Sequence, residues 1–259
     1  MIPVALTIAG SDPSGGAGIQ ADLKTFHRFG VYGEAVITLL TVQNTTRVSR
    51  VETMAPALVV EQLQAVLEDI RPGAAKTGAL GNEEIVNAVA EAAAGFDFPL
   101  VVDPVMISKH GAPLVSEAAR SAIANRLVPR AFLLTPNLEE AAALTGLRID
   151  GLAGMRRAAE ALAAMGAHAA LVKGGHLADC ATDVLFDGRQ WHEFPARRIA
   201  TNNTHGTGCT YSATITAELA RGTELVEAVA RAKRFIDEAI RTNPGLGRGS
   251  GPVNHFAAI

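Results

Sequence analysis

The stretch VALTIAGSDPSGGAGIQADLKTFHRF, residues 4–29, decides the fold class. It begins with a short apolar run, residues 4–9, that is typical of a buried strand. A loop rich in glycine follows, and residues 17–29 then place Ile19, Leu23 and Phe26 on one face of a helix. A strand, a glycine-rich loop and a helix in succession predict one unit of an α/β sheet.

The rest of the chain repeats this alternation. Strands are predicted at 35–42, 74–77, 100–103, 132–134 and 169–172, and a hairpin at 183–186 and 190–194 around Asp187 and Gly188. Helices are predicted at 56–70, 82–94, 116–127, 137–144, 151–165, 207–220 and 224–241. The pattern predicts a mostly parallel central sheet with helices on both faces. Because no linker or repeat interrupts it, we expect a single domain over residues 1–259.

Composition narrows the function classes. The net charge is −3 with no basic run, which argues against a nucleic-acid partner. No apolar run has membrane-spanning length, so no membrane association is expected. The first ten residues lack the features of a secretory signal, and two cysteines, Cys180 and Cys209, form no disulfide framework. We therefore expect a cytoplasmic protein.

The most specific chemical motif is NTHGTGC, residues 203–209, directly before a predicted helix. Free backbone N–H groups of Gly206, Thr207, Gly208 and Cys209 would surround an anion and stabilise a transferring phosphoryl group. The field of the helix N-terminus would favour a Cys209 thiolate that accepts a proton from a substrate hydroxyl. An ordinary glycine-rich turn with a structural cysteine explains the motif equally well.

Two more polar side chains, Gln43 at the end of a predicted strand and Asp22 early in the first predicted helix, are candidates for substrate binding. Gln43 ends an apolar strand, where its carboxamide suits an aminopyrimidine edge or is simply a satisfied amide. Asp22 could bind a substrate amine or hydroxyl, or could complement the dipole of its helix as an acid near the N-terminus. The loop from Gly10 to Gly18 carries neither standard nucleotide fingerprint, and is a substrate loop or a plain connection.

A second group of polar residues suits a nucleotide and a metal. Asn137 and Glu140 could hold a metal–phosphate unit, or form a capping box at a helix start. Lys173 could reach a phosphate or be a solvated turn lysine, and Asp103 could position Mg²⁺ or be a turn residue. The histidines show no metal-binding spacing.

Taken together, these stretches resemble the bacterial hydroxymethylpyrimidine/phosphomethylpyrimidine kinases of the ribokinase-like superfamily. The matching segments are LTIAGSDPSGGAGIQADLKT (6–25), QNT (43–45), KTG (76–78), DPVM (103–106), TPNLEEA (135–141), KGGH (173–176) and NTHGTGCT (203–210). They occur in the family's order and span nearly the whole chain.

The resemblance implies a ribokinase-like fold with small lid elements and two activities. ATP would phosphorylate 4-amino-5-hydroxymethyl-2-methylpyrimidine and then its monophosphate, and the diphosphate would feed thiamine synthesis. The cofactors implied are ATP and Mg²⁺, and we expect a homodimer. By similarity, the pyrimidine pocket is lined by Gly10, Asp22, Gln43 and Cys209. Gly206 and Gly208 belong to the anion hole, the nucleotide is bound near Lys173, Asn137, Glu140 and Thr207, and Mg²⁺ lies near Asp103 and Glu140.

Two departures bear on this expectation. In sugar kinases of the superfamily the glycine turn ends in an aspartate base, whereas here it ends in Cys209. Related pyridoxal kinases include some with a lid cysteine, but residues 107–111 (ISKHG) contain none, and His110 replaces an expected small residue. Pyridoxal or pyridoxine kinase activity is therefore the alternative, and the less favoured one.

Overall fold

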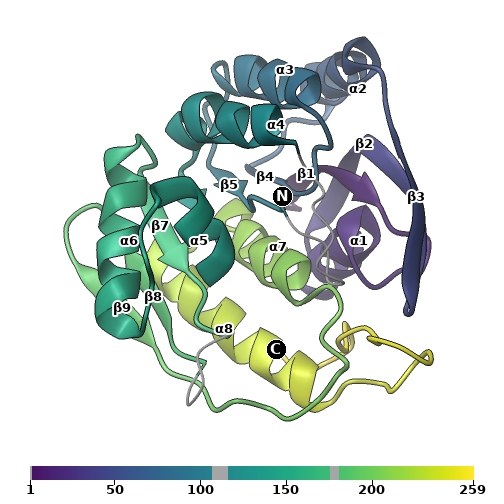
Figure 1. Ribbon diagram of the computed structural model, residues 1–259. Coiled ribbons are helices and arrows are strands. Elements are labelled where there is room, and N and C mark those ends of the chain that lie inside the picture. Colours follow the sequence, from purple (N-terminus) through teal and green to yellow (C-terminus); the bar gives the residue numbers. More distant parts are fainter. Residues whose placement is uncertain (1, 107–115, 176–180) are drawn as a thin grey trace.

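Nine strands form one sheet in the computed structural model, which describes residues 2–106, 116–175 and 181–259 (Figure 1). The spatial order is β3-β2-β1-β4-β5-β6-β7-β8-β9. The strands are β1 Val4–Ser11, β2 Tyr32–Asn44, β3 Arg47–Thr53, β4 Ala74–Thr77, β5 Leu100–Val102, β6 Leu133–Leu134, β7 Ala169–Val172, β8 Asp183–Phe186 and β9 Trp191–Phe194. Strands β2, β1, β4, β5, β6 and β7 are parallel, and antiparallel β3, β8 and β9 complete the two edges. The prediction of a mostly parallel α/β sheet is confirmed.

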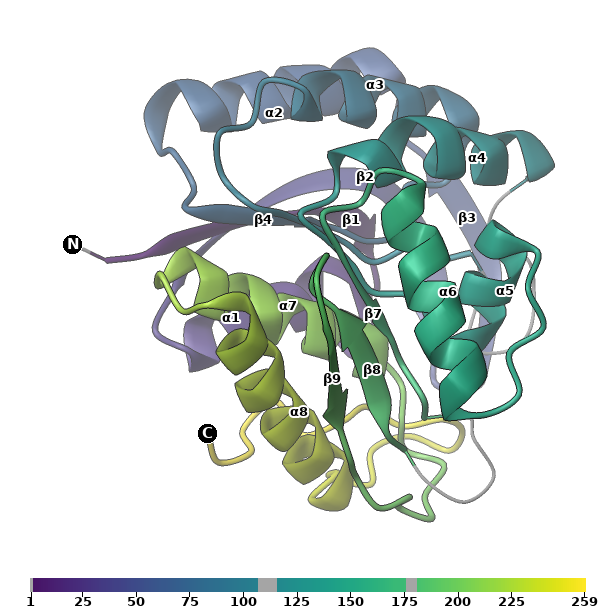
Figure 2. The same ribbon diagram turned by 90° about the vertical axis from the view of Figure 1, so that its left-hand side faces the viewer.

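Helices cover both faces of this sheet (Figure 2). One face carries α1 Gly18–Arg28, α7 Thr207–Ala220 and α8 Leu225–Arg241. The other carries α2 Pro56–Asp69, α3 Glu83–Ala93, α4 Glu117–Ala122, α5 Leu138–Thr145 and α6 Leu152–Ala164. Alternate strand residues supply the two cores, as Val101 packs on one face while Leu100 and Val102 pack on the other. The apolar strands are therefore buried on both sides.

Helix α7 is the buried helix that carries Cys209 in its first turn. Every residue from Thr210 to Leu219 is buried. Two of its buried hydroxyl groups are satisfied within the helix, since Thr214 donates to the Thr210 carbonyl and Thr216 to the Ser212 carbonyl, both at 2.8 Å. Packing on all sides therefore fixes where the helix begins and where Cys209 lies.

Two local features differ from the sequence-based prediction. Strand β3 was not predicted, because it is mostly exposed and polar and so lacks a clear apolar alternation. The predicted helix 116–127 is interrupted after Ala122 by a π-helical turn, Ile123–Leu127, and a 3₁₀ turn, Val128–Arg130. The wider turn keeps Ile123 and Leu127 buried before Pro129 ends the helix.

Within the described ranges, none of the helices is both long enough and apolar enough to cross a lipid bilayer.

Candidate active site

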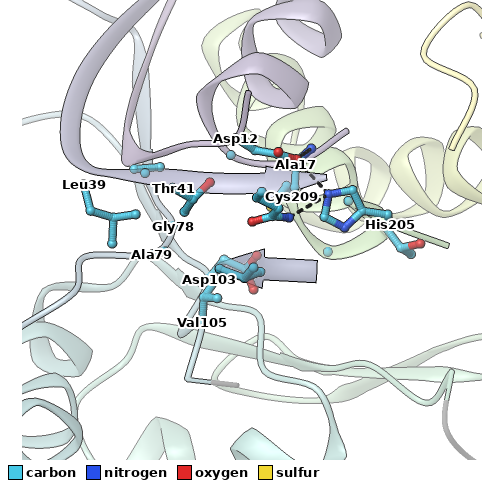
Figure 3. Close-up of a pocket in the computed structure, with 18 of the residues that line it drawn as sticks. Asp12, Ala17, Leu39, Thr41, Gly78, Ala79, Asp103, Val105, His205 and Cys209 are labelled. Carbon is cyan, nitrogen blue, oxygen red and sulfur yellow. Dashed lines mark hydrogen bonds and ion pairs between the residues drawn. The ribbon is translucent and has the colours of Figure 1, made fainter. Parts of the chain in front are cut away.

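A cavity of about 480 Å³ lies at the carboxyl edge of the parallel strands (Figure 3). Segments at the ends of strands line it, among them Gly10–Asp12 at the end of β1, Gly78 and Ala79 after β4, and Asp103 after β5. Parallel strands bring such segments to one edge, which is where open α/β sheets bind ligands. On β2, the alternate residues Leu39, Thr41 and Gln43 line the same cavity. The predicted strand-end groups are thus neighbours in space.

The glycine turn forms one wall of the cavity. Gly206 has φ 78° and is the N-cap of α7, and a side chain there would collide with the carbonyl oxygen of Gly16. The N–H of Thr207 donates to the Thr204 carbonyl at 3.3 Å. The next two N–H groups, those of Gly208 and Cys209, belong to the first turn and have no intrahelical partner. This geometry favours an anion at the mouth of the helix.

An ion pair that also lines the cavity lies beside the glycine turn. Lys173 Nζ lies 3.0 Å from Asp103 Oδ1, and Thr135 Oγ1 lies 3.4 Å from the same oxygen. Burial alone would lower the pKa of Lys173, but Asp103 and Glu140 outweigh it and raise that pKa. A Cβ on Gly208 would lie 3.4 Å from Lys173 Nζ and 3.5 Å from Asp103 Oδ2. A glycine at this position therefore lets the turn approach the charged pair closely.

Asn137 and Glu140 form a complete capping box and also line the cavity. The Glu140 N–H donates to Asn137 Oδ1, and the Asn137 N–H donates to Glu140 Oε2, both at 2.9 Å. Burial, with a smaller contribution from Asp103, raises the pKa of Glu140 to about 7, although Lys173 acts against it. The carboxyl group thus has a structural contact and a cavity-facing position at once.

Cys209 as a whole residue is partly exposed and lines the cavity. Burial of the sulfur raises the pKa of Cys209 to about 12, while the nearby Lys76 ammonium acts in the opposite direction. The expected thiolate does not match this result, because desolvation and the nearby Asp22 and Asp103 carboxylates outweigh the effect of Lys76. At neutral pH the group is a thiol.

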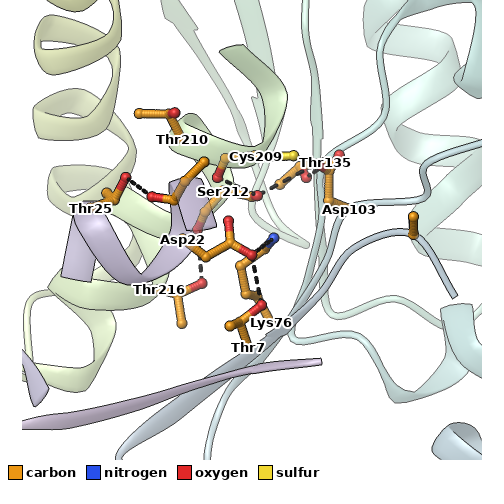
Figure 4. Close-up of polar contacts among 12 residues, drawn as sticks. Thr7, Asp22, Thr25, Lys76, Asp103, Thr135, Cys209, Thr210, Ser212 and Thr216 are labelled. Atoms are coloured by element: carbon orange, nitrogen blue, oxygen red, sulfur yellow. Dashed lines mark hydrogen bonds and ion pairs between the residues drawn. The ribbon is translucent and has the colours of Figure 1, made fainter. Parts of the chain in front are cut away.

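Asp22 needs a correction, because it is not among the residues that line the cavity. Its side chain is fully buried, and Oδ2 lies 2.8 Å from Lys76 Nζ and 2.6 Å from Thr7 Oγ1 (Figure 4). It also lies in the second turn of α1 rather than the first, so complementing the helix dipole does not explain it either. Burial raises its pKa, and Lys76 opposes that effect. The carboxylate is a partner of a buried lysine beneath the cavity, and has no access to a ligand in this structure.

Asp12, His205 and Gln43 connect the glycine-rich loop after β1, the glycine turn and the end of β2. His205 Nε2 lies 2.7 Å from Asp12 Oδ2 and 3.2 Å from the Gln43 carboxamide (Figure 3). All three side chains line the cavity, with Asp12 and His205 buried. Asp12 accepts further hydrogen bonds from Ser14 and from the Ala17 N–H.

Apart from Asp22, every residue predicted for the site lines this cavity: Gly10, Gln43, Asp103, Asn137, Glu140, Lys173, Gly206, Thr207, Gly208 and Cys209. The expectations about residues 107–111, including His110, and about Cys180 lie outside the described residues. Sequence reasoning assigned no role to Asp12, His205 or Lys76, although all three stand in the quoted motifs. Lys76 had a usable signal, because a lysine in the short apolar strand AAKT is rarely buried without an acidic partner.

Comparison with known proteins gives a consistent result. Residues 12–254 match the family model described as Phosphomethylpyrimidine kinase. The hydroxymethylpyrimidine/phosphomethylpyrimidine kinase of Rhizobium meliloti (strain 1021) is 49% identical over 99% of this chain and 98% of its own length. The thiamine biosynthesis bifunctional protein ThiED of Geobacter sulfurreducens is 50% identical over 98% of this chain, which spans 52% of that longer protein.

Among solved structures, an ADP complex of Bacillus subtilis pyridoxal kinase superposes with a TM-score of 0.91 at 38% identity. The match covers 99% of this chain and 98% of that one. The similarity confirms a ribokinase-like fold and places the chain among the small-molecule kinases with that architecture. It belongs to the phosphomethylpyrimidine kinase family.

Proposed function

We propose that this protein uses ATP to phosphorylate 4-amino-5-hydroxymethyl-2-methylpyrimidine, and then its monophosphate, giving the diphosphate for thiamine synthesis. One observation carries the proposal: a single cavity holds both the anion-binding turn at the start of α7 and the Gln43 carboxamide. The turn suits a transferring phosphoryl group, and the carboxamide suits the edge of an aminopyrimidine. The names and identities of the relatives support the same substrate.

The phosphoryl side of the cavity combines donors and charges. The Gly208 and Cys209 amides would stabilise the equatorial oxygens of the γ-phosphate, and Lys173 would bind a phosphate oxygen as a point charge. Lys173 is already paired with Asp103 at 3.0 Å, so its ammonium group is held in place before a nucleotide arrives. Positioning and charge stabilisation account for most of the catalysis in phosphoryl transfer.

The carboxylates of Asp103 and Glu140 fit a magnesium ion. Their mutual repulsion helps to raise the pKa of Glu140, and a cation between them would relieve that repulsion. No group of three or more His, Cys, Asp or Glu residues suitable for a metal occurs in the described part of the chain. Mg²⁺ commonly uses one or two carboxylates plus water and phosphate oxygens, so two acids suffice. When bound, it would neutralise negative charge on the phosphates.

The substrate side is apolar with one polar end. Leu39 and Val51 provide apolar walls, and Gln43 provides hydrogen-bonding groups at the end of β2. A flat ring between such walls would direct its hydroxymethyl group toward the glycine turn and Cys209. Because Cys209 is a thiol with a pKa of about 12, we assign it the orientation of the substrate hydroxyl through a hydrogen bond, while the hydroxyl proton passes to an oxygen of the transferred phosphoryl group late in the transfer.

We also propose a single kinase domain over residues 1–259 that forms homodimers and works in the cytoplasm, where ATP and Mg²⁺ are available. On β2, Leu40 and Val42 point away from the cavity-lining Thr41 and are 44% and 56% exposed. Two large apolar side chains on the outer face of an edge ribbon suit a contact with a second copy.

The proposed function is tested by ATP consumption in a coupled assay with four acceptors: the aminopyrimidine alcohol, its monophosphate, pyridoxal and a sugar. We expect both pyrimidines to stimulate ADP release more strongly than pyridoxal and the sugar. A preference for pyridoxal would favour the vitamin B6 alternative, and stimulation by none of them would contradict a kinase of this class.

A further inference from the structure

The Asp12–His205–Gln43 contact contains a hydrogen-bonding conflict that the proposed reaction does not explain. One ring nitrogen, His205 Nε2, faces two partners, with Asp12 Oδ2 at 2.7 Å and the Gln43 carboxamide nitrogen at 3.2 Å. A ring nitrogen either donates one proton or offers one lone pair, so it cannot donate to one partner and accept from the other.

The ring has little freedom to resolve this conflict by moving. The backbone of His205 is held on both sides: its backbone N–H donates to the Gly251 carbonyl at 3.0 Å, and its carbonyl accepts from the Val253 N–H at 3.2 Å. A Cβ on Gly16 would lie 2.5 Å from His205 Cδ2, so the loop after β1 packs directly on the ring. The side chain is buried between these segments.

The partners of Asp12 decide where the proton lies. Although burial would raise the pKa of Asp12, hydrogen bonds from His205 and Ser14 lower it, so the group is a carboxylate at neutral pH. A carboxylate only accepts hydrogen bonds, and here it also accepts from Ser14 and the Ala17 N–H. A lone pair on Nε2 only 2.7 Å from Oδ2 would be repulsive. His205 Nε2 therefore carries the proton and donates to Asp12.

A protonated Nε2 determines which end of the Gln43 carboxamide faces it. An NH2 group 3.2 Å from an N–H would set two donors against each other, whereas the amide oxygen can share that proton. The two ends of a carboxamide have nearly the same shape, so the hydrogen-bond network decides its orientation. The oxygen then faces His205, and the NH2 group faces the cavity.

We propose that Asp12 and His205 are a positioning pair that fixes the Gln43 carboxamide with its NH2 group toward the cavity, and so selects ligand rings that present an acceptor nitrogen there. This inference rests on the proposed function, because it names how that site recognises its substrate. A carboxamide without the pair could turn and present either end. The fixed orientation of the Gln43 carboxamide therefore contributes to binding of the aminopyrimidine and not to the transfer step.

The first test is the substitution His205→Leu, measured with the aminopyrimidine alcohol as acceptor. We expect KM to rise roughly tenfold, the effect of losing about one hydrogen bond to the ligand, with kcat close to that of the wild type. His205→Gln, whose side-chain N–H reaches the position of Nε2, should restore most of the loss. If His205→Leu fails a thermal melt, His205→Asn replaces it, since its shorter amide does not reach Asp12 and Gln43.

A matched control and a double variant separate positioning from general damage. His192 Nε2 also lies 2.7 Å from a carboxylate, Asp187 Oδ2, on the β8–β9 hairpin, so His192→Leu removes the same type of contact and should leave KM unchanged. In a Gln43→Ala background, His205→Leu should have no further effect on KM. An equal rise in KM in both backgrounds, or the same result for His205→Leu and His192→Leu, would overturn the proposal.

A second measurement does not depend on the reaction. Long-range ¹H–¹⁵N correlation spectra of the ligand-free protein should show His205 protonated at Nε2, and a lone pair at Nε2 would overturn the pair. Wild-type protein that phosphorylates no pyrimidine contradicts the proposed function instead, whereas active protein with unaffected variants contradicts only the positioning pair.

Discussion

Cys209 shows how two opposing effects act on one side chain. It lies in the first turn of α7, where the helix field favours an anion, yet burial raises its pKa to about 12. The loose transition state of phosphoryl transfer needs little assistance from a base until the new bond is nearly formed. A thiol that orients the hydroxyl, while its proton passes late to an oxygen of the transferred phosphoryl group, is compatible with both facts.

Cys209→Ala should therefore affect the two phosphorylations unequally. We expect kcat to fall about a hundredfold with the aminopyrimidine alcohol, whose hydroxyl Cys209 orients for attack. The fall should be much smaller with the monophosphate, because its phosphate nucleophile is already ionised at neutral pH. Single-turnover rates for each acceptor measure this, and equal losses in both steps would rule out a specific role of Cys209 at the substrate hydroxyl.

The buried pair of Asp22 and Lys76 should dominate local stability. Asp22→Asn or Lys76→Met leaves one charge without its partner in a fully buried position, which typically costs about 3–5 kcal/mol in the free energy of unfolding. Replacing both residues together should cost less than the sum of the single changes. Urea unfolding of the three variants checks this, and additive losses would show that the two side chains do not interact.

At the scale of elements, α5 depends on its N-terminal capping box. Asn137→Ala should lower the free energy of unfolding by about 1 kcal/mol, whereas Glu140→Gln retains an acceptor for the Asn137 N–H and should lower it less. Glu140→Gln should nevertheless weaken Mg²⁺-dependent activity, because it removes a negative charge. Similar losses of stability in both variants would contradict the separation of the two roles.

Glu140 also predicts a pH dependence. Its pKa is raised from 4.5 to about 7 in the folded state, so between these values the unfolded chain releases a proton that the folded protein keeps. The folded state is therefore destabilised as pH rises from about 4.5 to 7, and Glu140→Gln should remove that part of the trend. Over the same range the apparent Mg²⁺ affinity should strengthen as Glu140 ionises. Thermal melts and Mg²⁺ titrations at several pH values check both, and parallel wild-type and variant curves would contradict them.

The glycine turn can be tested against a glycine of similar backbone conformation. Gly30 has φ 70°, and a Cβ added there would meet no atom within 4 Å. Gly30→Ala therefore introduces backbone strain alone, which should lower the free energy of unfolding by about 1–2 kcal/mol. Gly206→Ala adds a collision with the Gly16 carbonyl oxygen to a φ of 78°. We expect it to destabilise the protein more and to abolish phosphoryl transfer, as measured by unfolding and activity. A Gly206→Ala variant as stable and active as Gly30→Ala would show that the turn tolerates rearrangement.

The sequence was most informative about elements with clear periodicity. Strand β4 and helix α7 begin and end where their apolar patterns predict, Ala74–Thr77 and Thr207–Ala220. Strand β3 was missed, because an exposed polar ribbon has no buried face to impose a pattern. Motifs at strand ends were located correctly because parallel strands bring their carboxyl ends together. The burial of individual polar side chains was not predictable. Nothing in the local sequence around Asp22 shows that it faces Lys76 inside the protein rather than the cavity.

At the scale of the whole molecule, the two faces of the β2–β3 ribbon have separate roles. Thr41 and Gln43 face the cavity, while Leu40 and Val42 form the exposed outer face. Light scattering should give about twice the chain mass of 26.9 kDa. Leu40→Glu combined with Val42→Glu should shift the protein to the monomer with its fold intact, because charges oppose burial of that face. A monomeric wild-type protein would contradict the homodimer.

The central claim is that one cavity phosphorylates an aminopyrimidine alcohol twice. The most direct measurement is ³¹P NMR of the wild-type protein with ATP, Mg²⁺ and 4-amino-5-hydroxymethyl-2-methylpyrimidine. We predict a monophosphate ester signal that appears first and is then replaced by the two coupled signals of the diphosphate. No phosphorylated pyrimidine under conditions where pyridoxal is converted to its phosphate would contradict the account.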